Sequence, residues 1–140
     1  MEREQLISLL RAMEEGAKIK LRRGEEFFAV ISKFSDHNDE QYELNISFKK
    51  ISKEKVRFIL NEILDLNDLS QPIQFKFSKG GKNFGDVELS LKFMYWLDVL
   101  NFIDKFSLLE SNSKVEIEGK FEFQETTVRF YIFPFQQKLK

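Results

Sequence analysis

The chain has 140 residues, of which 42% are apolar and 32% are charged, and its formal net charge is −1. This length suits one domain with one hydrophobic core, and scattered charge with this apolar content is typical of a globular protein. The near-neutral charge excludes a general electrostatic attraction to nucleic acid or to an anionic membrane. The absence of cysteine excludes disulfides, thiolate catalysis and cysteine-based metal sites. We therefore predict a single domain over residues 1–140.

The sequence also bears on location. The N-terminus is charged from its second residue onward, which predicts that it is not a secretory signal peptide. The longest apolar stretch, residues 89–106, contains Lys92, Asp98 and Asp104, and a bilayer span needs about 20 apolar residues. Together with the lack of cysteine, these features predict a cytoplasmic protein without membrane contact.

The first half of the chain contains one helical pattern and three strand patterns. Apolar residues recur every three or four positions over residues 2–16, which predicts an amphipathic helix ended by Gly16. From residue 18 the period changes to two and predicts strands at 18–22, 27–34 and 42–49. A tight turn at 23–25 and a polar loop at 35–40 connect them. The strand at 27–34 is apolar on both faces, which is typical of a central strand.

The second half adds two helices and four strands. Ser52 is the expected N-cap of a helix that ends at 70–72, and its apolar stripe is Val56, Ile59, Leu60, Ile63 and Leu64. Strand patterns follow at 73–77 and 87–93, and a third helix is predicted over 94–110. The core stripe of that helix is Leu97, Leu100, Ile103 and Phe106. Alternation returns at 115–123 and 127–135, where Pro134 indicates a strand end or a sheet edge.

These elements repeat in an αββ(β)-αββ-αββ order. The order predicts an α+β fold in which an antiparallel sheet of about seven strands carries three helices largely on one face. Internal duplication explains the repetition, and so does the frequent use of αββ units to cover one face of a sheet. The sequence leaves both explanations open. It also contains 16 Phe, which predicts a core packed with aromatic rings, with exposed rings at a contact surface as the alternative.

No pattern indicates catalysis, a metal site or a cofactor, so we predict a non-enzymatic protein. His37 is the only histidine, and its acidic loop lacks the spacing of a calcium loop. Asp98 and Asp104 are six residues apart on one helix and therefore do not share a close face for acid–base work. The Lys-Gly-Gly-Lys segment at 79–82 lies between two strands, where a hairpin turn is expected rather than a phosphate-binding loop.

Basic residues gather in two short segments. They are Lys18, Lys20, Arg22, Arg23, Lys49 and Lys50. A basic sheet face with neighbouring aromatic rings can bind single-stranded nucleic acid through phosphate contacts and stacking. Glu116, Glu118 and Glu122 lie on a later strand, however, and would partly cancel this field. Nucleic-acid binding is therefore the alternative prediction.

The last strand carries the leading prediction. Val128, Phe130 and Ile132 alternate with Tyr131, Phe133 and Phe135, so the strand is apolar on both faces. Such a strand is either internal to the sheet or in contact with a partner. If the first set faces the helices, Tyr131, Phe133 and Phe135 point outward. We therefore predict a binding or assembly module that acts through protein–protein contacts or self-association, with these three residues as the interface.

Overall fold

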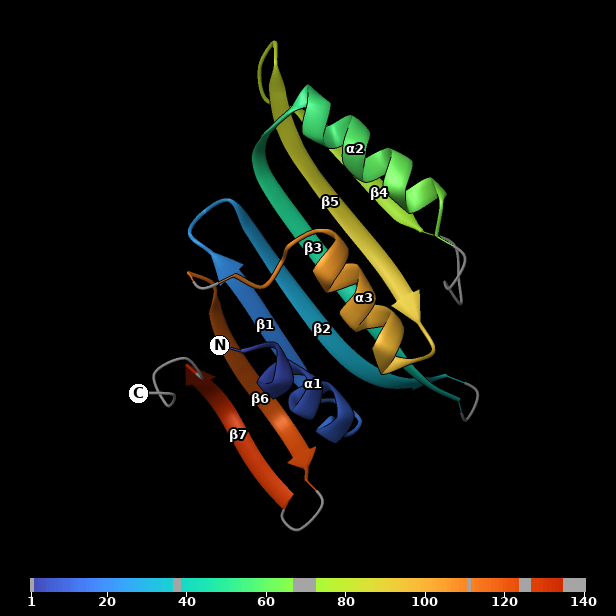
Figure 1. Ribbon diagram of the computed structural model, residues 1–140, viewed down its shortest axis with the longest axis vertical. Helices are drawn as coiled ribbons and strands as arrows, with labels where there is room; N and C mark the ends of the chain where they lie inside the picture. Colours follow the sequence, from blue (N-terminus) through green and yellow to red (C-terminus); the bar gives the residue numbers. More distant parts are fainter. Residues whose placement is uncertain (1, 37–38, 67–72, 111, 124–126, 135–140) are drawn as a thin grey trace.

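The structure of the protein, a computed structural model, describes residues 2–36, 39–66, 73–110, 112–123 and 127–134 (Figure 1). For residues 127–134 and Asp36 it describes the backbone alone. In chain order the elements are α1 (Arg3–Ala12), β1 (Lys18–Arg23), β2 (Phe27–Asp36), β3 (Asp39–Ser52), α2 (Lys53–Leu64), β4 (Gln74–Lys79), β5 (Phe84–Phe93), α3 (Trp96–Lys105), β6 (Lys114–Glu122) and β7 (Thr127–Pro134).

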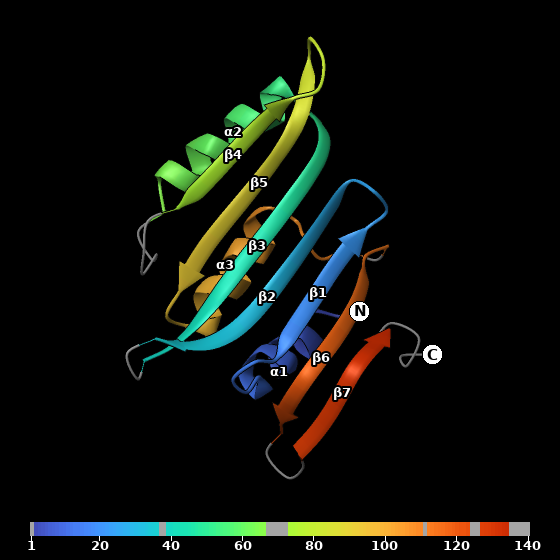
Figure 2. The same ribbon diagram turned by 180° about the vertical axis from the view of Figure 1, so that it is seen from behind.

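The seven strands form one antiparallel sheet in the order β4-β5-β3-β2-β1-β6-β7. The three helices lie on one face of this sheet, and no helix of the described residues lies on the other face (Figures 1 and 2). The predicted α+β class and element order are therefore confirmed. The strand predicted to be central is β2, which lies between β1 and β3 in the middle of the sheet.

The core lies between the sheet and the helices, and its strand side follows the predicted alternation. In β3 the buried side chains are Tyr42, Leu44, Ile46 and Phe48, and in β5 they are Val87, Leu89, Leu91 and Phe93. Phenylalanines fill much of the space: Phe27, Phe48, Phe93, Phe102, Phe106 and Phe121 are buried. Phe102 packs against Phe106 with ring centroids 4.4 Å apart. Six of the thirteen phenylalanines with described side chains are therefore buried in the core, as the prediction of an aromatic core expects, whereas Phe58, Phe77 and Phe84 are exposed.

The helices form a row in which α3 occupies the middle (Figure 1). Arg3 of α1 pairs with Asp104 of α3 at 2.9 Å. On the other side, Glu62 of α2 pairs with Lys105 of α3 at 2.8 Å, and the Phe58 ring packs edge-on against that of Phe106 at 5.9 Å. No helix in the described part of the chain is both long and apolar enough to cross a membrane.

The first helix is shorter than predicted, because it ends at Ala12 rather than at Gly16. Met13 has extended backbone angles and forms a bridge with Phe121 of β6, and the Glu14 N–H donates to the Lys120 carbonyl. Pairing with β6 therefore ends the helix four residues early. Gly16 instead lies in the turn into β1, with φ at +87°.

The third helix is also shorter than the predicted 94–110. It ends in a pair of hydrogen bonds typical of a Schellman cap, from the Ser107 N–H to the Asp104 carbonyl and from the Leu108 N–H to the Ile103 carbonyl. Ser107 takes the left-handed conformation with φ at +51°, a position where glycine is the usual residue. Because this position holds a serine and not a glycine, no signal in the sequence marks the end of the helix.

The second helix begins as predicted, because the Ser52 hydroxyl accepts a hydrogen bond from the Lys55 N–H. Its apolar stripe is narrower than predicted. Ile59 and Ile63 are buried, but Leu60 is 39% exposed and Leu64 is 73% exposed. The prediction that these two leucines belong to the core is therefore wrong. The stripe of α3 differs in the same way, because Leu97 is exposed while Val99 and Phe102 are buried.

Candidate functional site

The candidate site lies where β4 forms one edge of the sheet. β4 pairs with β5 on one side, and in the described part of the chain no strand pairs with its other side. α2 lies beside β4 at this edge on the helix-covered side, and the two run in opposite directions (Figures 1 and 2). We call β4 and the adjoining flank of α2 the β4 edge. An unpaired strand edge of this kind can accept a further strand.

The flank of α2 at the β4 edge is apolar. Phe58 and Glu62 contact α3, so the residues on the opposite side of the helix turn away from the helix row. Leu60 and Leu64 occupy that opposite side and are four residues apart, which places them on one face. Two exposed leucines therefore lie on the side of α2 that faces away from α3, at the β4 edge.

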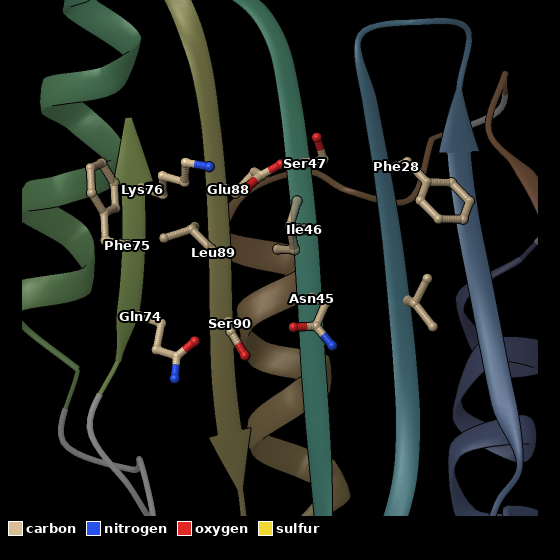
Figure 3. A pocket seen from close by; sticks show the side chains of 11 residues that line it. Phe28, Asn45, Ile46, Ser47, Gln74, Phe75, Lys76, Glu88, Leu89 and Ser90 are labelled. Atoms are coloured by element: carbon tan, nitrogen blue, oxygen red, sulfur yellow. The ribbon is translucent and has the colours of Figure 1, made fainter. Parts of the chain in front are cut away.

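The strand beneath α2 continues this apolar surface. Phe75 turns toward α2 (Figure 3) and is half-buried. Phe77 is 42% exposed. Phe77 pairs in register with the buried Val87, so it lies on the helix-covered face. Its ring lies directly over Gly85, where an added Cβ would approach the Phe77 Cε1 to 2.5 Å. Because Gly85 has no side chain, the Phe77 ring can lie close to the sheet. Much of the ring nevertheless remains in contact with solvent.

Basic side chains surround the apolar part of the β4 edge. Lys53 and Arg57 lie on the same exposed side of α2 as the two leucines, and Lys76 and Lys79 are exposed on β4. The Lys53 N–H donates to the Asn83 carbonyl, which places the start of α2 next to the β4–β5 turn. Among the described residues, none of these four cations pairs with a carboxylate.

The face of the sheet without helices contains a second surface feature, a shallow trough. One hollow of about 420 Å³ lies over β3 and β5. Phe28 of β2 bounds it on one side and Gln74 and Lys76 of β4 on the other, with the short side chains of Ser47 and Ser90 between them (Figure 3). A neighbouring hollow of about 670 Å³ shares Phe28 and Ser47 and extends toward the β1–β2 turn.

The structure brings together only part of the basic set predicted from the sequence. Arg22, Lys49 and Lys50 line the larger hollow, and the Arg22 guanidinium lies 5.0 Å from the Phe28 ring centroid. Three carboxylates line the same hollow, namely Glu25, Glu26 and Asp86. Lys49 lies 3.7 Å from Asp86, and the backbone N–H of Lys50 donates to the same carboxylate. The formal charge of the hollow is therefore balanced.

The other basic residues lie elsewhere. Lys18 and Lys20 are on β1 outside the hollow, and the Lys20 ammonium pairs with Glu118 at 3.0 Å. Arg23 points to the opposite face, where its guanidinium lies 4.7 Å from the Phe27 ring centroid and pairs with Glu110. It also forms an ion pair with Glu26, a turn residue that lines the hollow. The guanidinium also donates to the Ser107 carbonyl, so Arg23 fastens the loop after α3 to β1.

The predicted interface lies on the other edge strand. β7 pairs with β6 at the end of the sheet and ends at Pro134, so it is not internal to the sheet. Tyr131 and Phe133 belong to this strand, but their side chains and all of Phe135 lie outside the described residues. The backbone register places Phe133 opposite Ile117 and shifts between Ile117 and Gly119. The interface role of these three residues stays a prediction.

No catalytic or metal-binding arrangement is found among the described residues. They contain no group of three or more His, Asp or Glu side chains that could hold a metal ion, and His37 lies outside them. The groups whose pKa is displaced from its ordinary value belong to surface ion pairs. The Asp104 carboxylate raises the pKa of Arg3, and a hydrogen bond from Lys20 lowers that of Glu118.

No protein-family model, curated protein or solved structure matches this chain. The interpretation of its surface therefore depends on the residues themselves.

The sequence did not identify the β4 edge as a candidate site. Leu60 and Leu64 match the spacing of a core stripe, and Phe75 and Phe77 match a half-buried strand. What exposes Leu60, Leu64 and Phe77 is the place of β4 at the end of the sheet, which depends on strand order. The available signal was the density of Lys in and around β4, because charged residues are frequent on edge strands.

Proposed function

We propose that this protein is a non-enzymatic binding and assembly module that acts through protein–protein contacts at the β4 edge. The observation that carries this proposal is the exposure of Leu60, Leu64 and Phe77 beside β4, whose outer side pairs with no strand among the described residues. Single exposed apolar residues are common on protein surfaces, but a group of them along one edge is typical of an interaction site. The tolerance of an edge strand for a new strand adds a second, backbone-based means of attachment.

The trough on the open face supports the alternative, nucleic-acid binding, less well. It has an aromatic ring beside a basic side chain, as stacking and phosphate contact require. Its carboxylates equal its basic side chains in number, however, and a binding site for a polyanion needs a net positive field. Protein contact is therefore the better-supported function, and the cytoplasmic location predicted from the sequence remains an expectation.

The proposal is tested by the Leu60→Ser/Leu64→Ser double variant, with Leu97→Ser as the matched control. Leu97 lies on α3 and is half exposed, so the control removes an exposed apolar side chain from a surface away from the β4 edge. The molar mass of the purified protein is measured by light scattering during size-exclusion chromatography. In parallel, cross-linked partners are captured from the source cells with each variant.

We expect the wild type and Leu97→Ser to show the same oligomeric state and the same partners, and the double variant to lose one or both. All three proteins should unfold at similar denaturant concentrations, because exposed leucines contribute little to the core. The proposal is contradicted if the double variant has the same mass and captures the same partners as the wild type.

A further inference from the structure

We infer that the β4 edge binds an extended segment of a partner protein in which apolar and acidic side chains alternate, and that this segment adds to β4 as an eighth strand. The inference rests on the proposed protein-binding function and specifies its partner. It follows from three properties of the β4 edge. One side of β4 pairs with no strand in the described part of the chain, positive charge lies beside that side, and only one face of the edge is apolar.

The free side of β4 provides the backbone recognition. An added strand, in either direction, would form a backbone hydrogen-bond ladder like the antiparallel one that β4 already forms with β5 over Gln74–Lys79. Main-chain hydrogen bonds of this type do not depend on sequence, so they provide affinity, and the side chains on each face provide specificity. A bound segment of about six residues would match the length of β4.

The charge at the β4 edge disfavours a second copy of β4 as the occupant. In an antiparallel pairing of β4 with itself that keeps the two sheet faces continuous, well-overlapped registers place the Lys76 of the two copies directly opposite or diagonal to each other. Like charges at such positions are destabilising. Lys53, Arg57 and Lys79 add further positive charge on the helix side of the same edge. The charge pattern instead complements an acidic segment.

The two faces of the β4 edge determine the alternation. Lys76 pairs in register with Glu88 and lies on the open face of the sheet (Figure 3). Phe75 and Phe77 pair in register with the buried Leu89 and Val87 and therefore lie on the helix-covered face, where α2 is. Neighbouring side chains of an added strand point alternately to these two faces. A side chain beside Lys76 is therefore best acidic, and the side chains before and after it are best apolar, because they would be covered by α2.

The test uses a capped, fluorescein-labelled peptide of about eight residues in which Val and Glu alternate. One control peptide alternates Val and Lys, and another is the Val/Glu peptide N-methylated at every second residue, which removes backbone donors but keeps the charge and the apolar area. Binding to the full chain is measured by fluorescence anisotropy. Hydrogen exchange with and without peptide reports which backbone amides become protected.

We expect the Val/Glu peptide to bind, both control peptides to bind at least about tenfold more weakly, and amides of β4 to become protected. Lys76→Glu should weaken binding about tenfold, and Lys76→Gln should have an intermediate effect. The matched control is Lys114→Glu, an exposed lysine on β6, which should change affinity by less than about twofold.

The inference is overturned if the Val/Glu peptide does not bind, if the N-methylated peptide binds equally well, or if Lys76→Glu has no effect. These outcomes are distinct from failure of the proposed function. If the protein forms a dimer that requires Leu60 and Leu64 but does not bind the peptide, the proposed protein-binding function stands. The occupant of the β4 edge would then be a second copy of the chain rather than an acidic segment. If the protein is a monomer and its partners do not depend on those leucines, both the proposed function and this inference are contradicted.

Discussion

The ammonium group of Lys33, on the helix-covered face of β2, donates a hydrogen bond of 2.9 Å to the backbone carbonyl of Met13, the C-cap residue of α1. Lys33 is only 8% exposed, and its charge also lies 3.3 Å from Glu40 and 5.4 Å from the Tyr42 ring centroid. The backbone of Lys33 exchanges hydrogen bonds with Gly16 and Ala17. This one residue therefore holds the end of α1 and the loop that follows it against the centre of the sheet.

Replacing Lys33 by Met should destabilise the fold by about 1–3 kcal/mol, because the aliphatic stem is kept but the buried Met13 carbonyl loses its donor. The free energy of unfolding is measured by denaturant titration. The control is Lys18→Met at an exposed position on β1, which should change stability by less than about 0.5 kcal/mol. Equal effects of the two substitutions would show that the hydrogen bond to Met13 contributes nothing.

Two neighbouring residues of α2 test the side of the helix that packs on the sheet. Ile63 is 3% exposed and Leu64 is 73% exposed. Ile63→Ala should cost about 2–5 kcal/mol through lost burial and a residual cavity, whereas Leu64→Ala should cost less than about 0.5 kcal/mol. Denaturant unfolding of both variants decides the point, and a loss at Leu64 as large as that at Ile63 would show that both leucine and isoleucine are core residues.

The period-two patterns made most of the sheet predictable. In β3 and β5 every second residue is apolar, and a one-residue slip would move all of these side chains to the wrong face, so the pattern fixes both the strand and its buried face. The Ser52 cap was predictable for a similar reason, because a side-chain hydroxyl at that position meets a purely local need of the helix start.

What the sequence did not determine depends on contacts between distant segments. α1 stops at Ala12 because Met13 pairs with Phe121, more than a hundred residues away. Leu60 and Leu64 carry the same local signal as Ile59 and Ile63, and the difference between them is the position of α3 on one side of α2. The edge positions of β4 and β7 follow from strand order, which the alternation within each strand does not contain. The candidate site at the β4 edge was missed for this reason.

The ion pair between Lys20 and Glu118 predicts a specific pH response. A hydrogen bond from the Lys20 ammonium, helped by its charge, lowers the pKa of the Glu118 carboxyl below its ordinary value. Because the folded-state pKa is the lower one, the stabilisation by this pair is present above the unfolded-state pKa and is lost as the pH falls through the folded-state value. In Lys20→Gln the pKa of Glu118 should move back up toward its ordinary value, which a carboxyl NMR titration measures. An unchanged Glu118 pKa in that variant would contradict the assignment.

Gly119 and Gly24 form a matched pair for backbone strain. Both have positive φ, but a Cβ at Gly119 would lie 2.9 Å from the Ala17 Cα, whereas at Gly24 it would meet nothing within 4 Å. Gly24→Ala should cost about 1–2 kcal/mol from the left-handed conformation alone. Gly119→Ala should lower the stability clearly more. The new Cβ would meet backbone atoms of Ala17, in the turn before β1, and backbone atoms cannot rotate away as a side chain can. Thermal unfolding of the two variants compares them, and equal losses would show that the contact with Ala17 relaxes without cost.

The balanced charge of the larger hollow on the open face predicts how the protein responds to oligonucleotides. Arg22, Lys49 and Lys50 share this hollow with three carboxylates, so few counterions would be released when a polyanion approaches. Binding of single-stranded and double-stranded oligonucleotides, measured by anisotropy at two salt concentrations, should therefore be weak and should change little with salt. Glu25→Gln removes one carboxylate from the hollow without adding bulk and should strengthen the binding at low salt. A wild-type protein that already binds tightly at low salt and loses that affinity at high salt would instead support nucleic-acid binding as the function of this face.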